Sequence, residues 1–270
     1  MSPYRAPADT RAPDVLVCAG LDPSGGAGLV ADVRVVSELG GRPCGVVTAL
    51  TVQNTTGVVG SHPCDPDVVG HQLTFLLTDV EMKAIKLGMI GSAAIARAIA
   101  NALHLSAAPV VWDPVAFASR GQQTPLNDDT LEEAMMALKP HLTLVTPNKQ
   151  ELFMMTGLPT GTYVMAEAAG RALARKLDTA VLVKGGHLGG DESVDLLIHA
   201  GSPDRGIELR SPRIKGGEDV HGTGCALSSS IATYLAQGRE LDEAVQLGKQ
   251  YVTRMIENPV HPGRGASAVR

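Results

Sequence analysis

The sequence predicts an α/β fold in which a central, mostly parallel sheet lies between two layers of helices. Short apolar runs alternate with segments of helical periodicity along the 270 residues, and this alternation indicates right-handed βαβ units. Only 3% of the residues are aromatic, so the core is expected to consist of aliphatic side chains, as in strands buried on both faces. Polar clusters rich in Gly and Pro follow several apolar runs, at the edge where open α/β sheets bind ligands.

The expected strands are short runs dominated by Val, Leu, Ile and Ala. They lie at residues 14–19, 45–50, 84–87, 109–112, 142–145 and 180–183. A further strand or hairpin is expected between Ser193 and Arg210. Four of these strands end in polar clusters, at residues 20–23, 113–114, 146–148 and 184–186.

The expected helices combine apolar residues at spacings of three and four with start and stop signals. Pro66 opens one helix, the first turn of another is acidic, and Gly157 and Gly238 end two more. The helices are expected at residues 29–39, 65–77, 92–103, 127–138, 149–156, 165–177, 222–237 and 241–257.

The chain is expected to form one domain over residues 14–270, because no internal repeat, linker or composition step divides it. Residues 1–13 are polar with three prolines and are expected to be a flexible tail. A net charge of −5 argues against a nucleic-acid surface, and no run approaches the ~20 apolar residues of a membrane span. None of the four cysteines forms a C-x-x-C pair. We therefore expect a cytoplasmic protein with reduced thiols.

The strongest candidate site is residues 220–225 (VHGTGC), which open a long helix. Gly222 and Gly224 flank Thr223, so the backbone can approach a ligand closely, and the first N–H groups of the helix form an anion hole. Cys225 stands at the same helix start, where a thiol pKa is lowered and a thiolate could accept a proton from a substrate hydroxyl. The alternatives are an ordinary Gly-containing loop and a buried, inert cysteine.

The loop at residues 20–28 matches the dinucleotide fingerprint loosely, as Gly26-x-Gly28-x-x-Ala31. The second strand lacks the acidic residue that binds the ribose, so a dinucleotide site is disfavoured. The sequence also contains no P-loop motif.

Asp113, Asn148 and Glu151 stand at or just past strand ends, where oxygen ligands could hold Mg²⁺ beside phosphates. Asn148 and Glu151 also have the spacing of a capping box, and both roles are compatible. Lys184 follows an apolar run, where its ammonium could meet a phosphate, although most lysines are solvated.

Asp32 and Gln53 could hydrogen-bond a polar heterocycle. From the residues alone, a helix-surface acid and a loop-capping amide are the better interpretations of this pair.

Seven motifs resemble those of the hydroxymethylpyrimidine/phosphomethylpyrimidine kinases, in family order from about residue 14 to 265. They are residues 19–28 (AGLDPSGGAG) with 31–32 (AD), 48–55 (TALTVQNT), 86–89 (KLGM), 113–115 (DPV), 146–151 (TPNKQE), 183–187 (VKGGH) and 221–225 (HGTGC). Each motif alone is weak, but together they are highly specific.

This resemblance implies a ribokinase-like three-layer α/β/α sandwich and a role in thiamine biosynthesis. It implies that Mg-ATP phosphorylates 4-amino-5-hydroxymethyl-2-methylpyrimidine and then its monophosphate. The positions that match the family's pyrimidine site are Gly20, Asp32, Gln53, Met89 and Val115. Those that match the nucleotide and magnesium region are Asn148, Glu151 and Lys184, with Asp113 as a further metal ligand. Residues 222–224 match the anion hole and Cys225 the general base, and the family also implies a homodimer.

The sequence departs from the family pattern after residue 115. It continues as residues 116–121 (AFASRG), with Ser119 where the family has Lys, so a phosphate contact from this loop is in doubt, or is taken over by Arg120. Val220 replaces a common Thr or Ser, and residues 263–265 (GRG) match the family ending only loosely.

Three other functions compete with a pyrimidine kinase. A pyridoxal or pyridoxine kinase of the same superfamily shares the hydroxymethyl group of the substrate. A non-catalytic binding protein of the same fold is disfavoured by the presence of Asn148, Glu151, Lys184 and Cys225. A nucleotide-dependent dehydrogenase lacks the ribose-binding acid.

Overall fold

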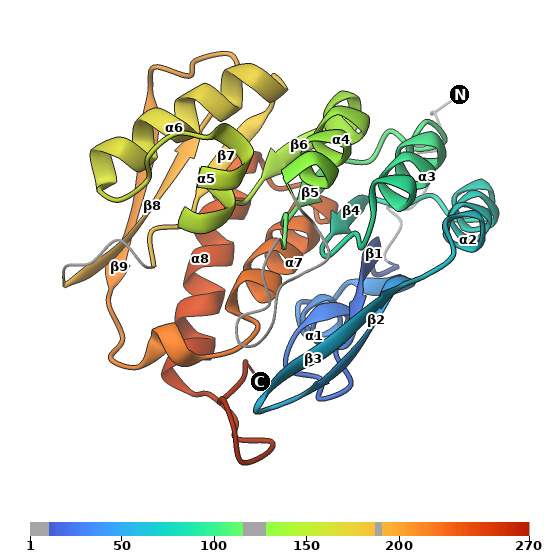
Figure 1. Cartoon of the computed structure of the whole chain (residues 1–270), viewed down its shortest axis with the longest axis horizontal. Helices are drawn as coiled ribbons and strands as arrows, with labels where there is room; N and C mark the ends of the chain where they lie inside the picture. Colours follow the sequence, from blue (N-terminus) through green and yellow to red (C-terminus); the bar gives the residue numbers. More distant parts are fainter. Residues whose placement is uncertain (1–10, 116–127, 187–190, 270) are drawn as a thin grey trace, which may run out of the picture.

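The computed structural model describes residues 11–115, 128–186 and 191–269 of the chain. The predicted N-terminal tail lies mostly outside these residues, as do Ser119, Arg120 and His187. The described part forms a nine-stranded sheet in the order β3-β2-β1-β4-β5-β6-β7-β8-β9 (Figure 1).

The six central strands run parallel, and the strands at both edges are antiparallel to their neighbours. The strands are β1 (Asp14–Leu21), β2 (Arg42–Asn54), β3 (Gly57–Pro63), β4 (Ala84–Leu87), β5 (Val110–Trp112), β6 (Leu142–Val145), β7 (Ala180–Val183), β8 (Glu192–Ile198) and β9 (Gly206–Pro212).

Eight α-helices lie along the described part of the chain: α1 to α6 fall between strands, and α7 and α8 follow the last strand. They are α1 (Gly28–Glu38), α2 (Pro66–Asp79), α3 (Ala93–Leu103), α4 (Asp128–Leu138), α5 (Lys149–Thr156), α6 (Tyr163–Leu177), α7 (Thr223–Ala236) and α8 (Leu241–Glu257) within the described ranges. Two short 3₁₀ turns lie at Lys139–His141 and Gly217–Asp219.

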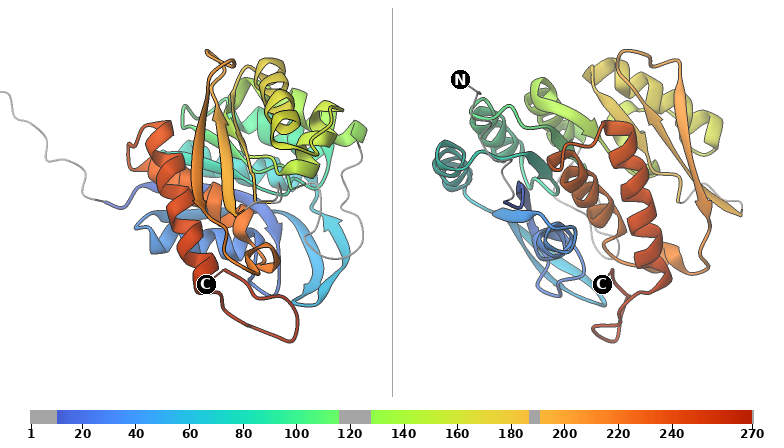
Figure 2. Two further views of the ribbon diagram at one scale, coloured as in Figure 1. Left: turned by 90° about the vertical axis from the view of Figure 1, so that its left-hand side faces the viewer. Right: turned by 180° about the vertical axis from the view of Figure 1, so that it is seen from behind.

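The helices cover both faces of the sheet, as Figure 2 shows from the side. Helices α2 to α6 and one face of the central strands form one apolar cluster, which includes Leu73, Ile99 and Leu173. Helices α1, α7 and α8 and the opposite face form the second, which includes Val35, Ile231 and Val245. The predicted three-layer α/β/α sandwich is therefore confirmed.

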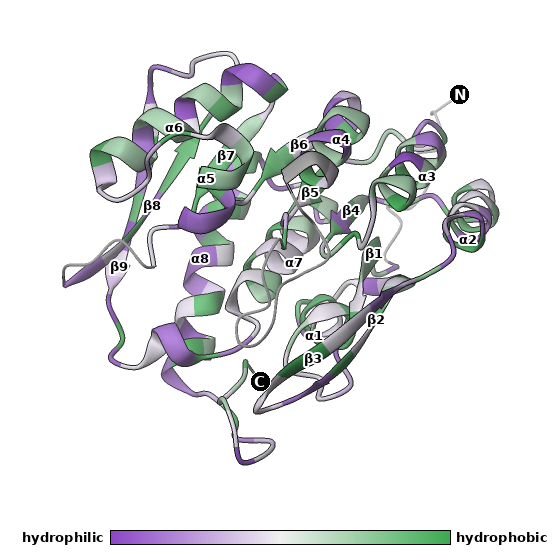
Figure 3. Cartoon of the chain, in the orientation of Figure 1, coloured by the Kyte–Doolittle hydropathy of each residue, from purple (hydrophilic) through white to green (hydrophobic). Residues whose placement is uncertain are grey.

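Burial on both faces explains why the central strands were visible in the sequence. Six consecutive residues of β1 are buried, and so is every residue of β4, β5 and β7. Figure 3 colours these strands mainly as hydrophobic, whereas α6 and α8 carry purple stretches. Within the described residues, no helix has both the length and the apolar character needed to cross a membrane.

The β2–β3 ribbon is the main departure from the expected elements. β2 extends four residues beyond the predicted strand, to Asn54, and pairs with β3, which the sequence did not predict. β3 lies at the sheet edge and has no buried residue, so it lacks the apolar pattern that marks the central strands.

Candidate active site

A single cavity of about 840 Å³ lies at the carboxyl ends of the parallel strands. Every site residue predicted from the sequence lines this cavity except Asp32. This placement follows from the parallel sheet, because the ends of β1, β4, β5, β6 and β7 all meet at the same edge.

The start of α7 forms one wall of the cavity. Gly222 caps the helix with a φ of 85°, and a Cβ there would lie 2.0 Å from the carbonyl oxygen of Gly26. Only glycine fits this position, because a side chain would be both strained and in collision. A Cβ at Gly224 would lie 3.2 Å from Lys184 Nζ, so the first turn of the helix passes directly beside this ammonium. The first backbone N–H groups of a helix have no intrahelical acceptor and favour an anion.

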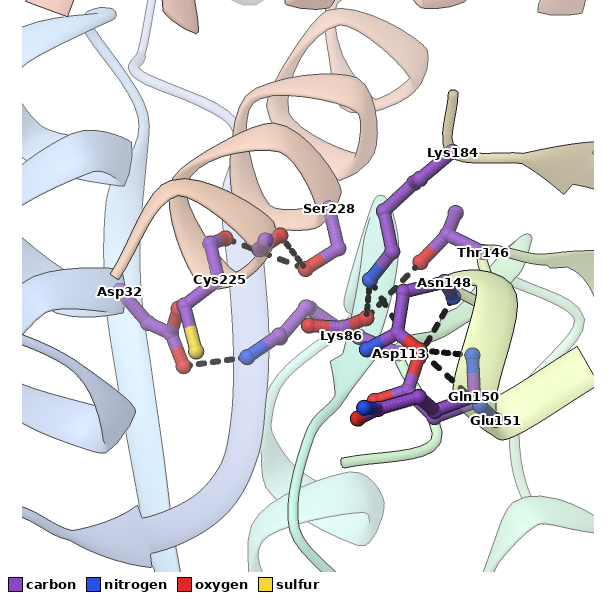
Figure 4. A network of polar contacts seen from close by, with 11 residues as sticks. Asp32, Lys86, Asp113, Thr146, Asn148, Gln150, Glu151, Lys184, Cys225 and Ser228 are labelled. Carbon is purple, nitrogen blue, oxygen red and sulfur yellow. Dashed lines mark hydrogen bonds and ion pairs between the residues drawn. The ribbon is translucent and has the colours of Figure 1, made fainter. Parts of the chain in front are cut away.

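Lys184 links two carboxylates beside this helix start (Figure 4). Its Nζ lies 2.6 Å from Asp113 Oδ1 and 3.6 Å from Glu151 Oε2. Thr146 donates a further hydrogen bond to Asp113 Oδ1 at 3.2 Å. Burial lowers the pKa of Lys184, but Asp113 and Glu151 outweigh it and raise the pKa above its usual range. The ammonium is therefore held charged beside the helix start.

Glu151 is fixed at the start of α5 by the predicted capping box. Asn148 Oδ1 accepts the backbone N–H groups of Gln150 and Glu151 at 2.9 Å, and the N–H of Asn148 donates to Glu151 Oε2 at 2.7 Å. Burial raises the pKa of Glu151 to about 7, against the opposing effect of Lys184. The capping role predicted for this pair is confirmed.

The pKa of the Cys225 thiol is raised and not lowered, contrary to the expectation from its place at a helix start. Burial raises the pKa of this thiol to about 12, because desolvation outweighs the ammonium of Lys86 and a backbone hydrogen bond from Gly28. Asp32 and Asp113 add to the increase, since negative charge nearby disfavours a thiolate. Figure 4 shows the sulfur beside the Lys86–Asp32 pair. The thiol is therefore neutral at physiological pH in this state of the protein.

Asp32 does not reach the cavity. Its side chain is fully buried, with Oδ2 2.5 Å from Lys86 Nζ, while the hydroxyl of Ser229 donates to Oδ1 at 2.7 Å. Burial raises the pKa of Asp32, and the ammonium of Lys86 opposes this increase. The predicted contact between Asp32 and a heterocycle is not seen in this structure, because the side chain is fully buried behind the cavity wall.

The remaining predicted ring-binding residues line the cavity on the side of β1, β2 and β4. Gly20, Gln53, Met89 and Val115 border the same space. A Cβ at Gly20 would lie 3.0 Å from the sulfur of Met89, so the absence of a side chain at Gly20 makes space for Met89. The walls here combine aliphatic surface with one amide, an arrangement that suits a small flat heterocycle.

Comparison with known proteins identifies the family. A family model described as phosphomethylpyrimidine kinase matches residues 22–270. The chain belongs to this family. The hydroxymethylpyrimidine/phosphomethylpyrimidine kinase of Mycobacterium leprae is 36% identical, with 94% of this chain and 92% of the relative covered.

Some relatives of this chain are longer proteins. The thiamine biosynthesis bifunctional protein ThiED of Geobacter sulfurreducens is 40% identical over 94% of this chain, which spans 51% of that protein. The chain spans 34% of a multifunctional ThiED from Corynebacterium efficiens.

Two solved structures share the fold. The pyridoxal kinase of Staphylococcus aureus in complex with ADP has a TM-score of 0.85 at 28% identity, with 96% of this chain and 93% of that chain covered. The phosphomethylpyrimidine kinase of Clostridium difficile has a TM-score of 0.75 at 32% identity, with 91% and 100% covered. These likenesses confirm the ribokinase-like fold and a kinase of this superfamily.

Three residues that the structure brings to the cavity have no role predicted from the sequence. Lys86 borders the cavity and holds Asp32, and Asp22 and His221 lie together in the wall, with His221 Nε2 3.1 Å from Asp22 Oδ2. A lysine inside an apolar run was the available signal for Lys86. Asp22 and His221 lie in two of the seven motifs, but they are 199 positions apart, so no local pattern indicates their contact.

Proposed function

We propose that this protein transfers the γ-phosphoryl group of ATP to the hydroxymethyl group of 4-amino-5-hydroxymethyl-2-methylpyrimidine, and then to the resulting monophosphate. One observation carries the proposal: a single cavity joins the Lys184–Asp113–Glu151 cluster, the start of α7 and the aliphatic ring site. The named activities of the relatives with similar length support the same substrate.

The mechanism follows from the charges around the cavity. Phosphoryl transfer depends mainly on positioning and on neutralising negative charge. The N–H groups at the start of α7 and the ammonium of Lys184 lie side by side, so together they stabilise the charge that develops on the transferred group. Lys184 exchanges its carboxylate partners for phosphate oxygens when the nucleotide enters.

Asp113 and Glu151 are the residues that would hold Mg²⁺. Their carboxylate oxygens are the ligand type that Mg²⁺ prefers, and both face Lys184 in the cavity. The described residues contain no cluster of three or more His, Cys, Asp and Glu side chains suited to a metal. This donor set therefore fits an ion that keeps several waters and is bound partly by phosphates, and such an ion supplies charge neutralisation.

Cys225 is proposed to orient the substrate hydroxyl. A neutral thiol with a pKa of about 12 is a poor proton acceptor near pH 7, and a loose transition state demands little deprotonation of the nucleophile. As the new phosphoester bond forms, the bond to ADP breaks, and the hydroxyl proton passes to an oxygen of the transferred phosphoryl group or to solvent. Replacing Cys225 with Ala is expected to leave the fold intact and to reduce turnover on the order of 100-fold. Unchanged turnover would remove Cys225 from the mechanism.

Pyridoxal kinase is the second candidate, because the S. aureus pyridoxal kinase has the higher of the two TM-scores. Both substrates present a hydroxymethyl group on a flat ring, so the ring site has to distinguish them.

The deciding experiment measures ADP release with hydroxymethylpyrimidine, with its monophosphate and with pyridoxal in separate reactions. The proposal expects turnover of both pyrimidines that depends on Mg²⁺. Turnover of pyridoxal alone would replace the proposal by the second candidate, and turnover without added divalent cation would contradict the metal assignment. The homodimer and the cytoplasmic location expected from the sequence stay predictions.

A further inference from the structure

The side-chain amide of Gln53 lies in a closed circuit of polar contacts in the cavity wall. His221 Nε2 lies 3.1 Å from Asp22 Oδ2 and 3.1 Å from Gln53 Nε2. On the other side of the amide, Thr51 Oγ1 lies 2.7 Å from the carbonyl oxygen of Leu21 and 3.2 Å from Gln53 Oε1. The circuit starts and ends at neighbouring residues, Leu21 and Asp22, where β1 gives way to its loop.

Asp22 determines where the proton of His221 resides. Its carboxylate accepts the N–H and the hydroxyl of Ser24 at 2.8 and 2.7 Å and the N–H of Ala27 at 3.0 Å. Burial opposes ionisation of Asp22, but the hydrogen bonds from His221 and Ser24 outweigh it and lower its pKa. A carboxylate this close requires a hydrogen on Nε2, because two lone pairs facing each other repel. His221 Nε2 is therefore a donor.

With this proton in place, two hydrogen-bond donors, His221 Nε2 and Gln53 Nε2, face each other. Gln53 Nε2 is also a donor, so its 3.1 Å contact with His221 Nε2 has no acceptor. The Thr51 hydroxyl has one hydrogen, which the shorter contact assigns to Leu21, so Gln53 Oε1 faces an oxygen without a hydrogen to share. Half a turn of the amide about its Cγ–Cδ bond exchanges its oxygen and nitrogen and removes both conflicts.

We propose that His221 and Asp22 form a positioning pair that holds the Gln53 amide with its oxygen toward His221 and its nitrogen toward Thr51. The hydrogen bonds then run in one direction. His221 shares its single Nε2 hydrogen between Asp22 Oδ2 and the Gln53 oxygen. Gln53 donates to Thr51, and Thr51 donates to Leu21. The backbone of His221 is itself held by Ser267, whose carbonyl accepts its N–H at 2.8 Å, and by Val269, which donates to its carbonyl at 3.1 Å.

The consequence is a fixed order of donor and acceptor on the cavity wall. After its bonds to His221 and Thr51, the amide retains one N–H and one oxygen lone pair for a ligand. This order complements a heterocycle edge in which a ring nitrogen accepts and the neighbouring amino group donates. A ring bound the other way round would set donor against donor. The inference rests on the proposed function in that it explains how an aminopyrimidine is selected and oriented.

The orientation can be measured without any turnover, by NMR of the full-length protein labelled with ¹⁵N-glutamine. The amide resonance of Gln53 is assigned by its loss in Gln53→Leu. The proposal expects nuclear Overhauser contacts from the amide protons to the methyl group of Thr51 and none to the His221 ring. Contacts to the His221 ring in place of Thr51 would overturn it.

Kinetics test the positioning role of His221. The variant His221→Phe keeps the ring volume and removes the donor, and His71→Phe, an exposed residue on α2, is the matched control. We expect kcat/KM for hydroxymethylpyrimidine to fall about tenfold, the value of one hydrogen bond, with the KM for ATP unchanged. Preference over an analogue that lacks the 4-amino group should shrink by a similar factor. An unchanged preference would refute the positioning role.

A second pair of variants covers the case in which His221→Phe fails to fold. Thr51→Val removes the acceptor of the Gln53 N–H at constant volume, and Thr51→Ser keeps the hydroxyl. The proposal expects Thr51→Val to lose preference for the amino group and Thr51→Ser to retain most of it, and equal losses would contradict it. If the enzyme phosphorylates no pyrimidine, the proposed function fails, and the NMR contacts still decide the orientation of Gln53.

Discussion

Lys86 and Lys184 border the same cavity, yet their side chains lie in different surroundings. Lys86 pairs with Asp32 at 2.5 Å, and both side chains are 0% exposed. Lys184 is shared between Asp113 and Glu151, and its side chain is 15% exposed toward the cavity. In both cases burial lowers the lysine pKa and neighbouring carboxylates reverse the effect, so both pKa values are raised.

The charge of Lys86 is fixed in a buried pair, whereas that of Lys184 is accessible from the cavity. Asp32 is out of reach of a ligand, because its side chain is fully buried and held by Lys86 and Ser229. The sealed pair therefore acts on the fold and on the neighbouring Cys225 thiol, whose pKa it influences. Lys184 has access to the cavity and two carboxylate partners, which is why we propose that it exchanges a partner for a phosphate. The same residue type is sealed in the fold in one place and open to the cavity in the other, and only the open one is proposed to bind substrate.

The largest effect is expected from Lys86→Met. Removing one partner of a buried ion pair leaves Asp32 charged and uncompensated, which lowers the free energy of unfolding by about 3–5 kcal/mol. Urea unfolding measures this change. Lys83→Met, an exposed lysine paired with Glu81, is the control, for which we expect less than about 0.5 kcal/mol. Equal stability of the two variants would mean that the sealed pair contributes nothing to the fold.

Lys184→Met is expected to reduce kcat by about 10²–10³, the usual loss when one charge-stabilising group is removed from a phosphoryl-transfer site. The protein should remain folded, because Glu151 can take up a proton when the ammonium is gone. Steady-state ADP release measures the loss. Lys176→Met removes an exposed lysine from a surface pair with Glu132 and should leave kcat unchanged. A loss that appears only in the KM for ATP would limit Lys184 to ground-state binding.

Glu151 should make stability depend on pH. Its pKa is raised from the ordinary 4.5 to about 7, so the folded state binds this proton more tightly than the unfolded state. The contribution to stability is complete below about pH 4.5 and is lost as the pH rises to about 7, up to about 3 kcal/mol. Unfolding free energies of the wild type and Glu151→Gln from pH 4.5 to 8 measure the difference. Gln keeps the capping box, so a wild-type slope that persists in the variant would assign the pH dependence to another group.

The smallest effect is expected at Asn148, which caps α5 and positions Glu151 of the Lys184–Asp113–Glu151 cluster. Asn148→Ala removes the N-cap and should lower stability by about 1 kcal/mol. Asn148→Ser retains a cap and should recover most of this loss in thermal or urea unfolding. If both variants lost the same stability, the Asn148 amide would be required for a contact other than the cap.

Local signals explain most of what could be predicted. The helix at residues 149–156 and its capping box matched the structure because their contacts lie within three residues. The strands at 84–87, 142–145 and 180–183 matched because extensive burial leaves short runs dominated by apolar residues. β3 was missed because an exposed edge strand has no such pattern.

The errors at the site share a different cause. The rule that a helix start lowers a thiol pKa holds for Cys225 only while solvent reaches the sulfur, and here burial outweighs it. Asp32 and Lys86 are 54 positions apart, and nothing near either residue in the chain indicates that they pair.

The sequence by itself determined the parallel strands and the helices along the chain, the seven motifs and the sheet edge at which their residues meet. These depend on short-range periodicity and on the direction of parallel strands. Only the tertiary structure decided which of those residues face the cavity, which are sealed behind it and which protons they hold. Those properties depend on desolvation and on partners distant in the chain, and both arise only when the layers pack together.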